Sequence, residues 1–196
     1  MKTEFKFSSA KVGQIPAHGL PEFALIGRSN VGKSSLLNLL AAAPIAKVSS
    51  TPGKTRLINH FLVDDRWWLV DLPGYGYART SHSERREFSK LITDYISKAP
   101  DLHFLFVLLD SRHEPLAIDL DFIDMLGREG VPFGLVFTKA DKQSAEKTRS
   151  VVAAYRRTLL KSWEQMPQLF ITSSAKRQGR DEILAFIEGC LQVVNK

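Results

Sequence analysis

The residues best suited to chemistry lie near the start of the chain, in a glycine-rich segment that ends in a lysine and a serine. Residues 27–34 read Gly-Arg-Ser-Asn-Val-Gly-Lys-Ser, which fits the pattern Gly-x-x-x-x-Gly-Lys-Ser/Thr of phosphate-binding loops. The glycines let backbone N–H groups surround a phosphate chain, Lys33 places a positive charge near the β- and γ-phosphates, and Ser34 offers a hydroxyl ligand to Mg²⁺. This segment therefore predicts a site for a nucleoside triphosphate and its magnesium ion.

A second candidate is the turn Asp-Leu-Pro-Gly at residues 71–74, which directly follows an apolar run. Because nucleotides bind at the carboxyl ends of parallel strands, a carboxylate at this point can hold Mg²⁺, in this case through water. The backbone N–H of Gly74 can meet the γ-phosphate. A turn of this composition is common in loops without any ligand, so the interpretation of Asp71 depends on the phosphate loop upstream.

The residues at positions 138–141, Thr-Lys-Ala-Asp, indicate which base such a nucleotide carries. A carboxylate accepts two hydrogen bonds at once, and guanine offers the matching donor pair at N1–H and N2–H₂, which adenine lacks. Asp141 therefore favours GTP over ATP. The stem of Lys139 can cover one face of the base, and Thr138 can tie this guanine loop to the phosphate loop. A solvated charged turn is the other interpretation of these residues.

The segment Thr-Ser-Ser-Ala-Lys at residues 172–176 follows the last predicted strand. Its small residues Ser173, Ser174 and Ala175 would let backbone N–H groups approach the O6 atom of guanine. Similar residues also form ordinary turns. The interpretation of this segment as a binding loop therefore depends on its position alone.

These segments need strands and helices that bring them to one edge of a sheet. Short apolar runs alternate with patterns of helical spacing along nearly the whole chain. The predicted strands are residues 22–27, 57–63, 67–72, 102–109, 132–138 and 168–172. The predicted helices are residues 33–43, 83–99, 115–130, 143–164 and 181–194.

The connections between these elements determine the expected fold. Residues 57–63 and 67–72 are joined so closely that they must form an antiparallel hairpin. The other strands alternate with helices, which is typical of right-handed parallel crossovers. We therefore expect an α/β fold, with a mainly parallel sheet, one antiparallel strand and helices on both faces. In the hairpin, Trp67 and Trp68 point to opposite faces, so we expect one of them in the core.

Composition and length set the remaining limits. With 196 residues, 44% of them apolar, the chain has the size and core material of one domain. We expect an N-terminal arm at residues 1–21 and a single GTP-binding domain at residues 22–196. The one cysteine, Cys190, excludes an internal disulfide framework. No signal peptide or bilayer-length apolar run is visible, so we expect a cytoplasmic protein with no membrane partner; we also expect a monomer.

The phosphate loop, the Asp71 turn, the guanine loop and the last loop, in this order and each at a strand end, resemble the translation-factor-related class of small GTPases. Within that class the whole chain is similar to the EngB family, bacterial GTPases implicated in large ribosomal subunit assembly and associated with formation of the division septum. The most particular segments are residues 27–35, 51–56, 71–77 and 138–141. The resemblance implies a three-layer, Ras-like G domain with the phosphate-loop NTPase fold, which binds GTP and GDP with Mg²⁺.

The resemblance also implies which residues touch the nucleotide and its metal ion. The metal ligands are Ser34, Thr55 and Asp71, the last through water. Thr55 is the switch I threonine that senses the γ-phosphate, and Thr51 is its nearest rival. Lys33 and Thr55 are the catalytic residues, and no general base is evident. The nucleotide-binding residues are Gly27, Arg28, Ser29, Asn30, Val31, Gly32, Lys33, Ser34, Ser35, Gly53, Lys54, Thr55, Asp71, Gly74, Thr138, Lys139, Asp141, Ser173, Ser174 and Ala175.

Position 75 departs from the pattern of Ras-like enzymes, which orient the attacking water with a glutamine directly after the Asp-x-x-Gly turn. Tyr75 cannot present an amide, so we expect slow isolated hydrolysis, at about 10⁻⁴ to 10⁻² per second. Asn30 resembles the asparagine of potassium-activated relatives, in which K⁺ supplies the positive charge that an arginine finger otherwise brings. K⁺ is therefore a candidate second cofactor; a chance polar residue at Asn30 is the alternative.

Lys and Arg outnumber Asp and Glu by 27 to 21, and basic residues gather in two places. The first cluster, beside the Asp71 turn, consists of Arg79, Arg85, Arg86 and Lys90. The second, on or beside the predicted helix 143–164, consists of Lys142, Lys147, Arg149, Arg156, Arg157 and Lys161. Binding of ribosomal RNA is the functional interpretation. A solvated helix face is the alternative, because no dedicated RNA-binding motif is present. Tyr75 and Tyr77 could contact the same partner.

We therefore expect a Mg²⁺-dependent GTPase whose GTP form engages the large ribosomal subunit or its assembly precursor, through ribosomal RNA. Both its role in ribosome assembly and its link to cell division rest on the resemblance alone. The alternative is a nucleotide-gated scaffold that binds ribosomal RNA and hydrolyses GTP incidentally. An ATPase is a third interpretation, which Asp141 disfavours.

Overall fold

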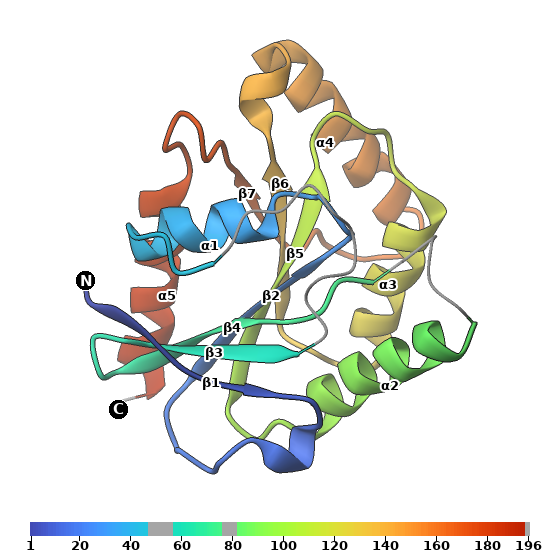
Figure 1. Ribbon diagram of the computed structural model, residues 1–196. Helices are drawn as coiled ribbons and strands as arrows, with labels where there is room; N and C mark the ends of the chain where they lie inside the picture. Colours follow the sequence, from blue (N-terminus) through green and yellow to red (C-terminus); the bar gives the residue numbers. More distant parts are fainter. Residues whose placement is uncertain (47–56, 76–81, 195–196) are drawn as a thin grey trace.

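The computed structural model describes residues 1–46, 57–75 and 82–194, and it shows one sheet with helices on both faces (Figure 1). The seven strands follow the order β1-β3-β4-β2-β5-β6-β7 across the sheet. They are β1 (Thr3–Ser9), β2 (Glu22–Gly27), β3 (Ile58–Val63), β4 (Trp67–Asp71), β5 (Leu102–Asp110), β6 (Phe133–Thr138) and β7 (Gln168–Ile171). The expected α/β, three-layer fold is confirmed.

The direction of the strands follows the lengths of their connections. β2, β4, β5, β6 and β7 pair in parallel, because a helix returns the chain between them. β3 pairs antiparallel with both β4 and β1. Among the described strands, β3 is thus the one that runs against the others, as predicted.

In the part of the chain that the structure describes, five α-helices cover the sheet, with two short 3₁₀ helices, η1 (Val12–Gln14) and η2 (Ala140–Lys142). The α-helices are α1 (Lys33–Ala41), α2 (His82–Lys98), α3 (Ala117–Arg128), α4 (Ala145–Leu159) and α5 (Arg180–Val194). Two separate hydrophobic cores result: α1 and α5 pack on one face, and α2, α3 and α4 on the other (Figure 1). None of the described helices is long and apolar enough to cross a membrane.

Neighbouring residues of one strand supply different cores, because successive side chains of a strand point to opposite faces. Trp67 belongs to the core under α1 and α5, and Trp68 to the core under α2, α3 and α4. The predicted opposition is confirmed. Both indoles are buried, with 4% and 7% of their surface exposed.

The predicted helix 143–164 is shorter in the structure. Ser144 caps α4 by accepting a hydrogen bond from the backbone N–H of Lys147 at 3.2 Å. At the other end, α4 stops at Leu159, and turns follow. Trp163 then packs edge-on against Phe133, and its indole N–H donates to Asp124 at 2.8 Å. Because of these tertiary contacts, the end of the predicted helix, which includes Trp163, does not continue α4.

The first residues of the chain differ most from the expectation of an N-terminal arm outside the G domain. Thr3–Ser9 forms β1, which pairs with β3 at the edge of the same sheet. Residues of the predicted N-terminal arm thus add an edge strand to the sheet of the G domain. Charged side chains suit this edge strand: Lys6 on β1 and Lys2 just before it both pair with Glu4.

A buried polar cluster fastens the rest of this segment to the sheet. Glu22, at the start of β2, is 1% exposed, and its carboxylate accepts a hydrogen bond from the Tyr95 hydroxyl of α2. His18 Nε2 and His60 Nε2 lie 2.8 and 3.2 Å from the other carboxylate oxygen. Burial tends to raise the pKa of Glu22, but the hydrogen bonds from His60, Tyr95 and His18 outweigh it and lower that pKa. Glu22 is therefore an ionised, fully bonded anchor.

Candidate nucleotide-binding site

The phosphate loop joins the end of β2 to the start of α1, as its sequence requires. A Cβ atom on Gly27 would lie 2.9 Å from the side chain and the carbonyl oxygen of Leu108, so only glycine fits there. Gly32 has a φ of +107° at the N-cap of α1, a conformation that favours glycine. The positive end of the α1 dipole thus meets the loop at Lys33, where a phosphate would lie.

The Asp71 turn approaches this loop from the neighbouring strand. Lys33 Nζ forms an ion pair with Asp71 Oδ1, and both side chains are nearly buried. Asn59 Nδ2 of β3 donates to the second carboxylate oxygen at 3.4 Å. Two residues that are 38 positions apart in sequence are thereby in contact, as the two motifs predicted.

The oxygen atoms near Asp71 are suitable ligands for a magnesium ion. Mg²⁺ prefers oxygen ligands, which the Ser34 hydroxyl on the first turn of α1 and the Asp71 carboxylate at the end of β4 can supply. Gly53, Lys54 and Thr55, together with the rival Thr51, lie outside the described residues.

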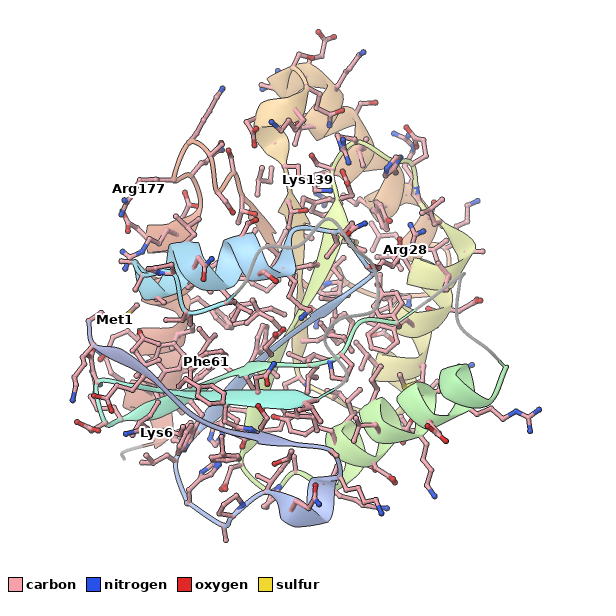
Figure 2. The ribbon with its side chains drawn as sticks, in the orientation of Figure 1. Met1, Lys6, Arg28, Phe61, Lys139 and Arg177 are labelled. Carbon is pink, nitrogen blue, oxygen red and sulfur yellow. The ribbon has the colours of Figure 1, made fainter. Side chains whose placement is uncertain are left out.

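The guanine loop is tied to the phosphate loop at two points. Thr138 Oγ1 donates to the carbonyl oxygen of Val31 at 2.6 Å, which confirms the predicted tie. Lys139 Nζ donates to the carbonyl oxygen of Asn30 at 2.5 Å. Arg28 and Lys139 consequently lie toward the same edge of the sheet, the one at which β2 and β6 end (Figure 2).

The last loop lies against the guanine loop, so its position matches the prediction. Ser173 Oγ donates to Asp141 Oδ1 at 2.7 Å, and the Ala140 N–H donates to the Thr172 carbonyl at 3.1 Å. The hydrogen bond from Ser173 lowers the pKa of Asp141, although burial opposes it. The Asp141 carboxylate is therefore ionised and oriented. Ser174 is half-buried and Ala175 is exposed beside it.

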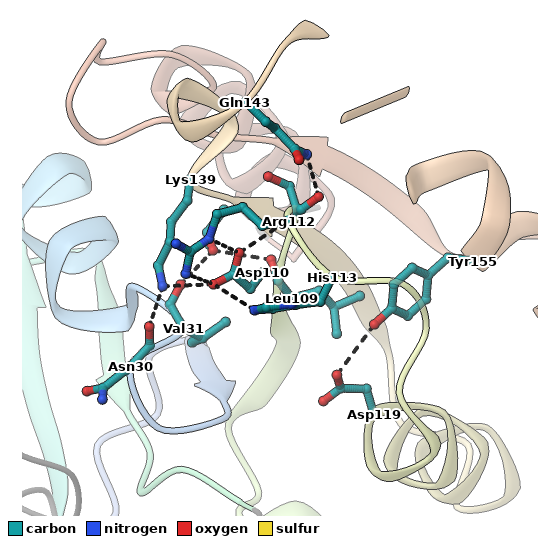
Figure 3. Close-up of polar contacts among 12 residues, drawn as sticks. Asn30, Val31, Leu109, Asp110, Arg112, His113, Asp119, Lys139, Gln143 and Tyr155 are labelled. Atoms are coloured by element: carbon teal, nitrogen blue, oxygen red, sulfur yellow. Dashed lines mark hydrogen bonds and ion pairs between the residues drawn. The ribbon is translucent and has the colours of Figure 1, made fainter. Parts of the chain in front are cut away.

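One further carboxylate lies at this edge, and the sequence motifs did not predict it. Asp110, the last residue of β5, contacts Lys139 Nζ at 2.8 Å and is bound by three donors of Arg112 (Figure 3). Burial would raise the pKa of Asp110, yet the hydrogen bonds from Arg112 and Lys139 outweigh it and hold that pKa well below its usual range. The signal was present, because Asp110 ends an apolar strand just as Asp71 does.

Tyr75 points into the fold and away from a partner. It is 8% exposed, its ring stacks on Phe122 with centroids 4.4 Å apart, and its hydroxyl donates to Asp119 Oδ1 at 2.8 Å. Burial and the neighbouring Asp119 raise the pKa of Tyr75 well above its ordinary value. The expectation that Tyr75 contacts a partner is therefore wrong, because its ring and hydroxyl are already bound inside the fold. Tyr77 lies outside the described residues.

The basic residues near α4 are exposed. No ion pair joins Lys147, Arg149, Arg156, Arg157 or Lys161 to an acidic side chain in the parts of the chain that the structure describes. Lys142 pairs with Asp141 at 3.4 Å. In the first cluster, Arg86 and Lys90 are exposed on α2, Arg79 lies outside the described residues, and nothing is described of the Arg85 side chain. The α4 cations remain free to meet an external anion.

Comparison with known proteins gives a consistent result. Residues 22–139 match the family model described as 50S ribosome-binding GTPase. The chain is 50% identical over 192 residues to the probable GTP-binding protein EngB of Porphyromonas gingivalis, covering 97% of this chain and 96% of that protein. It is also 50% identical over 193 residues to the protein of the same name from Bacteroides fragilis, with 98% and 96% coverage.

Solved structures share the fold at lower sequence identity. A crystal structure of a probable GTP-binding protein engB superimposes with a TM-score of 0.70 at 18% identity, covering 87% of this chain and 98% of that one. Aquifex aeolicus Era bound to GDP and AlF4⁻ superimposes with a TM-score of 0.69 at 18% identity, covering 86% of this chain and 56% of that one. A complex of Era with MgGDPNP and part of 16S ribosomal RNA gives a TM-score of 0.68 at 18% identity, with 86% and 55% coverage.

Proposed function

The chain belongs to the EngB family of GTP-binding proteins, so it is a phosphate-loop GTPase, and from this premise we propose that it is a Mg²⁺-dependent switch in assembly of the large ribosomal subunit. The observation that supports this best is the meeting of the phosphate loop with the guanine loop. Thr138 and Lys139 bond to the carbonyl oxygens of Val31 and Asn30. A guanine base and a phosphate chain can therefore be held by one connected frame.

In this proposal the metal ion is held by Ser34, by Thr55 and, through water, by Asp71. Magnesium supplies charge neutralisation at the phosphates during hydrolysis. Lys33 contacts the β- and γ-phosphates, Asp141 reads the base edge, and Lys139 covers one face of the base. The remaining phosphate-loop residues, Gly53 and Lys54, Gly74, and the last-loop residues Ser173, Ser174 and Ala175 complete the binding set.

Hydrolysis by the isolated protein should be slow, because the catalytic set is small. We assign catalytic roles to Lys33 and Thr55 and name no general base. Tyr75, which follows the Asp-x-x-Gly turn, is bound to Asp119 and Phe122 inside the fold, so it does not orient water at the phosphates. We propose that K⁺ at Asn30 supplies part of the missing positive charge.

We propose that the partner is the large ribosomal subunit or its precursor, contacted through ribosomal RNA. The exposed α4 cations support this, because unpaired Lys and Arg side chains on one helix suit a phosphate backbone. The family model is named for binding to the 50S ribosome. We further propose a monomer that acts in the cytoplasm, with a link to division-septum formation that rests on the resemblance to the family.

Sedimentation with purified ribosomal subunits tests this function. The protein is mixed with small or large subunits in GDP or in a non-hydrolysable GTP analogue, at several salt concentrations. Co-sedimentation with the large subunit in the analogue alone, weakening as salt rises, is the expected result. Absent or nucleotide-independent binding would contradict the switch.

The buried Tyr75 also favours a second function, a nucleotide-gated scaffold in which hydrolysis is incidental. Tyr75 is held inside the fold, so it cannot orient the water that attacks the γ-phosphate. Among the described residues, no other side chain occupies this position directly after the Asp-x-x-Gly turn. Multiple-turnover GTP hydrolysis with and without ribosomal particles separates the two functions. A strong stimulation supports the enzymatic switch, whereas an unchanged slow rate alongside GTP-dependent binding supports the scaffold.

A further inference from the structure

We propose that Asp110, oriented by Arg112, is a positioning residue of the nucleotide site that holds Lys139 in place to cover the base. The proposal rests on the guanine site assigned above. Asp110 does not touch the nucleotide in this proposal and acts through Lys139. It lies outside the motifs that identify the site.

The contacts of Asp110 form a directed chain that ends at the phosphate loop. Arg112 donates to Asp110 Oδ1 from its backbone N–H at 3.1 Å and from Nε at 2.9 Å, and it donates to Oδ2 from Nη2 at 2.7 Å. Lys139 Nζ donates to Oδ2 at 2.8 Å, and His113 Nε2 lies 4.0 Å from the same oxygen. The same ammonium group bonds to the carbonyl oxygen of Asn30 at 2.5 Å. Figure 3 shows these groups converging between β5, β6 and the phosphate loop.

The burial of Asp110 makes this contact strong enough to direct a lysine. The Asp110 side chain is 12% exposed, against 42% for Arg112 and 24% for Lys139. Ionised, it accepts charge-assisted hydrogen bonds, which are stronger than neutral ones. The planar guanidinium of Arg112 fixes the plane of the carboxylate, so Oδ2 is aimed at Lys139.

Lys139 needs such a partner because its side chain is long and flexible. Its backbone φ of +60° lies in the left-handed region, which fixes the direction in which the side chain leaves the loop. The Asn30 carbonyl provides one acceptor for the ammonium group and Asp110 provides the other. Without Asp110, the nucleotide itself would have to immobilise the lysine, at about 0.5–1.5 kcal/mol for a rotamer-rich side chain. This corresponds to about 2- to 13-fold weaker binding.

The proposal predicts a distinctive pattern of base selectivity. Lys139 covers the face of the base, which GDP and IDP share, whereas Asp141 reads the edge, where IDP lacks the N2 amino group. Loss of Asp110 should therefore weaken the binding of GDP and of IDP by the same factor. A merely structural disturbance of the guanine loop would also displace Asp141 and change the ratio of the two affinities.

The test measures dissociation constants for fluorescent GDP and IDP with the full chain and the variant Asp110→Asn, which keeps the size of the side chain and removes its charge. The expected result is about 2- to 13-fold weaker binding of both nucleotides, with their ratio unchanged. Asp181→Asn is the matched control, because that side chain is 96% exposed on α5; it should change neither affinity. A changed GDP to IDP ratio, or an unchanged affinity, would overturn the proposal.

A double-mutant cycle shows whether Asp110 acts through Lys139. In a Lys139→Ala background, Asp110→Asn should weaken GDP binding less than about twofold, because the group that it positions is gone. Full additivity of the two effects would overturn the proposal. If Asp110→Asn lowers the melting temperature strongly, Arg112→Ala replaces it in the cycle, since the Arg112 side chain is partly exposed. Arg112→Ala should also weaken GDP binding. An unchanged affinity for GDP would overturn the proposal.

The same measurements separate this inference from the assigned guanine site. If Lys139→Ala binds GDP as tightly as the unchanged protein, the assignment of Lys139 to the base is wrong. If Lys139→Ala weakens binding while Asp110→Asn does not, the site stands and the positioning role of Asp110 fails.

Discussion

At the scale of single residues, the direction of a carboxylate matters as much as its presence. Asp141 is oriented by the hydroxyl of Ser173, and that hydrogen bond lowers the pKa of its carboxyl group. It can therefore offer both oxygens to the N1–H and N2–H₂ of guanine. Asn30 lies in the phosphate loop with a φ of +61°, and Lys139 donates a hydrogen bond to its backbone carbonyl oxygen. The side-chain amide oxygen of Asn30 is therefore the atom available to a cation.

Replacement of Asp141 by asparagine should relax the guanine preference. Loss of the paired carboxylate acceptors should cost about 1–3 kcal/mol, which corresponds to about 5- to 150-fold weaker GDP binding. The affinity for ADP should not fall. Competition of GDP, XDP and ADP against a fluorescent nucleotide measures the change. Asp121→Asn, an exposed aspartate of α3, serves as the control. Equal losses for GDP and ADP would contradict the assigned role of Asp141.

If Asn30 helps to hold a potassium ion, GTP hydrolysis should run several-fold faster in KCl than in NaCl of the same ionic strength. The reason is that K⁺ adds positive charge where the transition state gains negative charge. The variant Asn30→Ala should lose this difference between the two salts. Rates that agree in both salts for the unchanged protein would remove K⁺ from the mechanism.

At the scale of elements, the segment before β2 belongs to the fold because two contacts hold it: β1 pairs with β3, and the Glu22 cluster joins the start of β2 to α2 and β3. The pKa of Glu22 in the folded protein lies below its ordinary value of 4.5. Ionised Glu22 therefore stabilises the fold above about pH 4.5, and this contribution is lost as the pH falls through the lower folded-state value.

The variant Glu22→Gln tests this electrostatic anchor. It should lower the free energy of unfolding by about 1–3 kcal/mol at pH 7, because a buried charged acceptor of three donors is replaced by a neutral amide. The difference from the unchanged protein should shrink as the pH is lowered below 4.5. Urea unfolding at pH 7 and at a pH below 4.5 measures this difference in the free energy of unfolding. Glu129→Gln, at an exposed position, is the control. A difference that grows in acid would contradict the assigned sign.

At the scale of the whole molecule, charge is distributed unevenly. The chain carries a formal net charge of +6, and several other exposed cations are balanced locally, as Arg66 is by Glu188 and Lys98 by Asp94. The cations of α4 have no such partners among the described side chains. Unbalanced charge on one helix suits binding to a polyanion, and the binding should weaken with salt.

Charge reversal on α4 should weaken binding to the large subunit without altering the nucleotide site. Arg149→Glu with Arg156→Glu should lower co-sedimentation in the GTP analogue and reduce the slope of log K against log salt by about 1 to 2. The affinity for GDP should stay unchanged. Arg66→Glu with Lys98→Glu is the matched control, because it makes the same change of net charge at exposed sites away from α4. Equal effects of the two double variants would argue against α4 as the contact surface.

The sequence by itself determined the features that depend on neighbouring residues. The phosphate loop, the alternation of strands with helices and the hairpin at residues 57–72 follow from local spacing, because hydrophobic period and loop length act within one or two elements. The ties from Thr138 to the phosphate loop and from the last loop to the guanine loop were also predictable, since parallel strands place their carboxyl ends at one edge.

The tertiary structure alone decided the features that depend on distant contacts. The pairing of β1 with β3, the burial of Tyr75 against Asp119 and the bond from Asp110 to Lys139 join residues that are 29 or more positions apart. Local pattern does not specify such pairs, because a buried donor or carboxylate takes whichever partner the packed chain brings within about 3 Å. Packing also ended α4 early by drawing Trp163 onto Phe133.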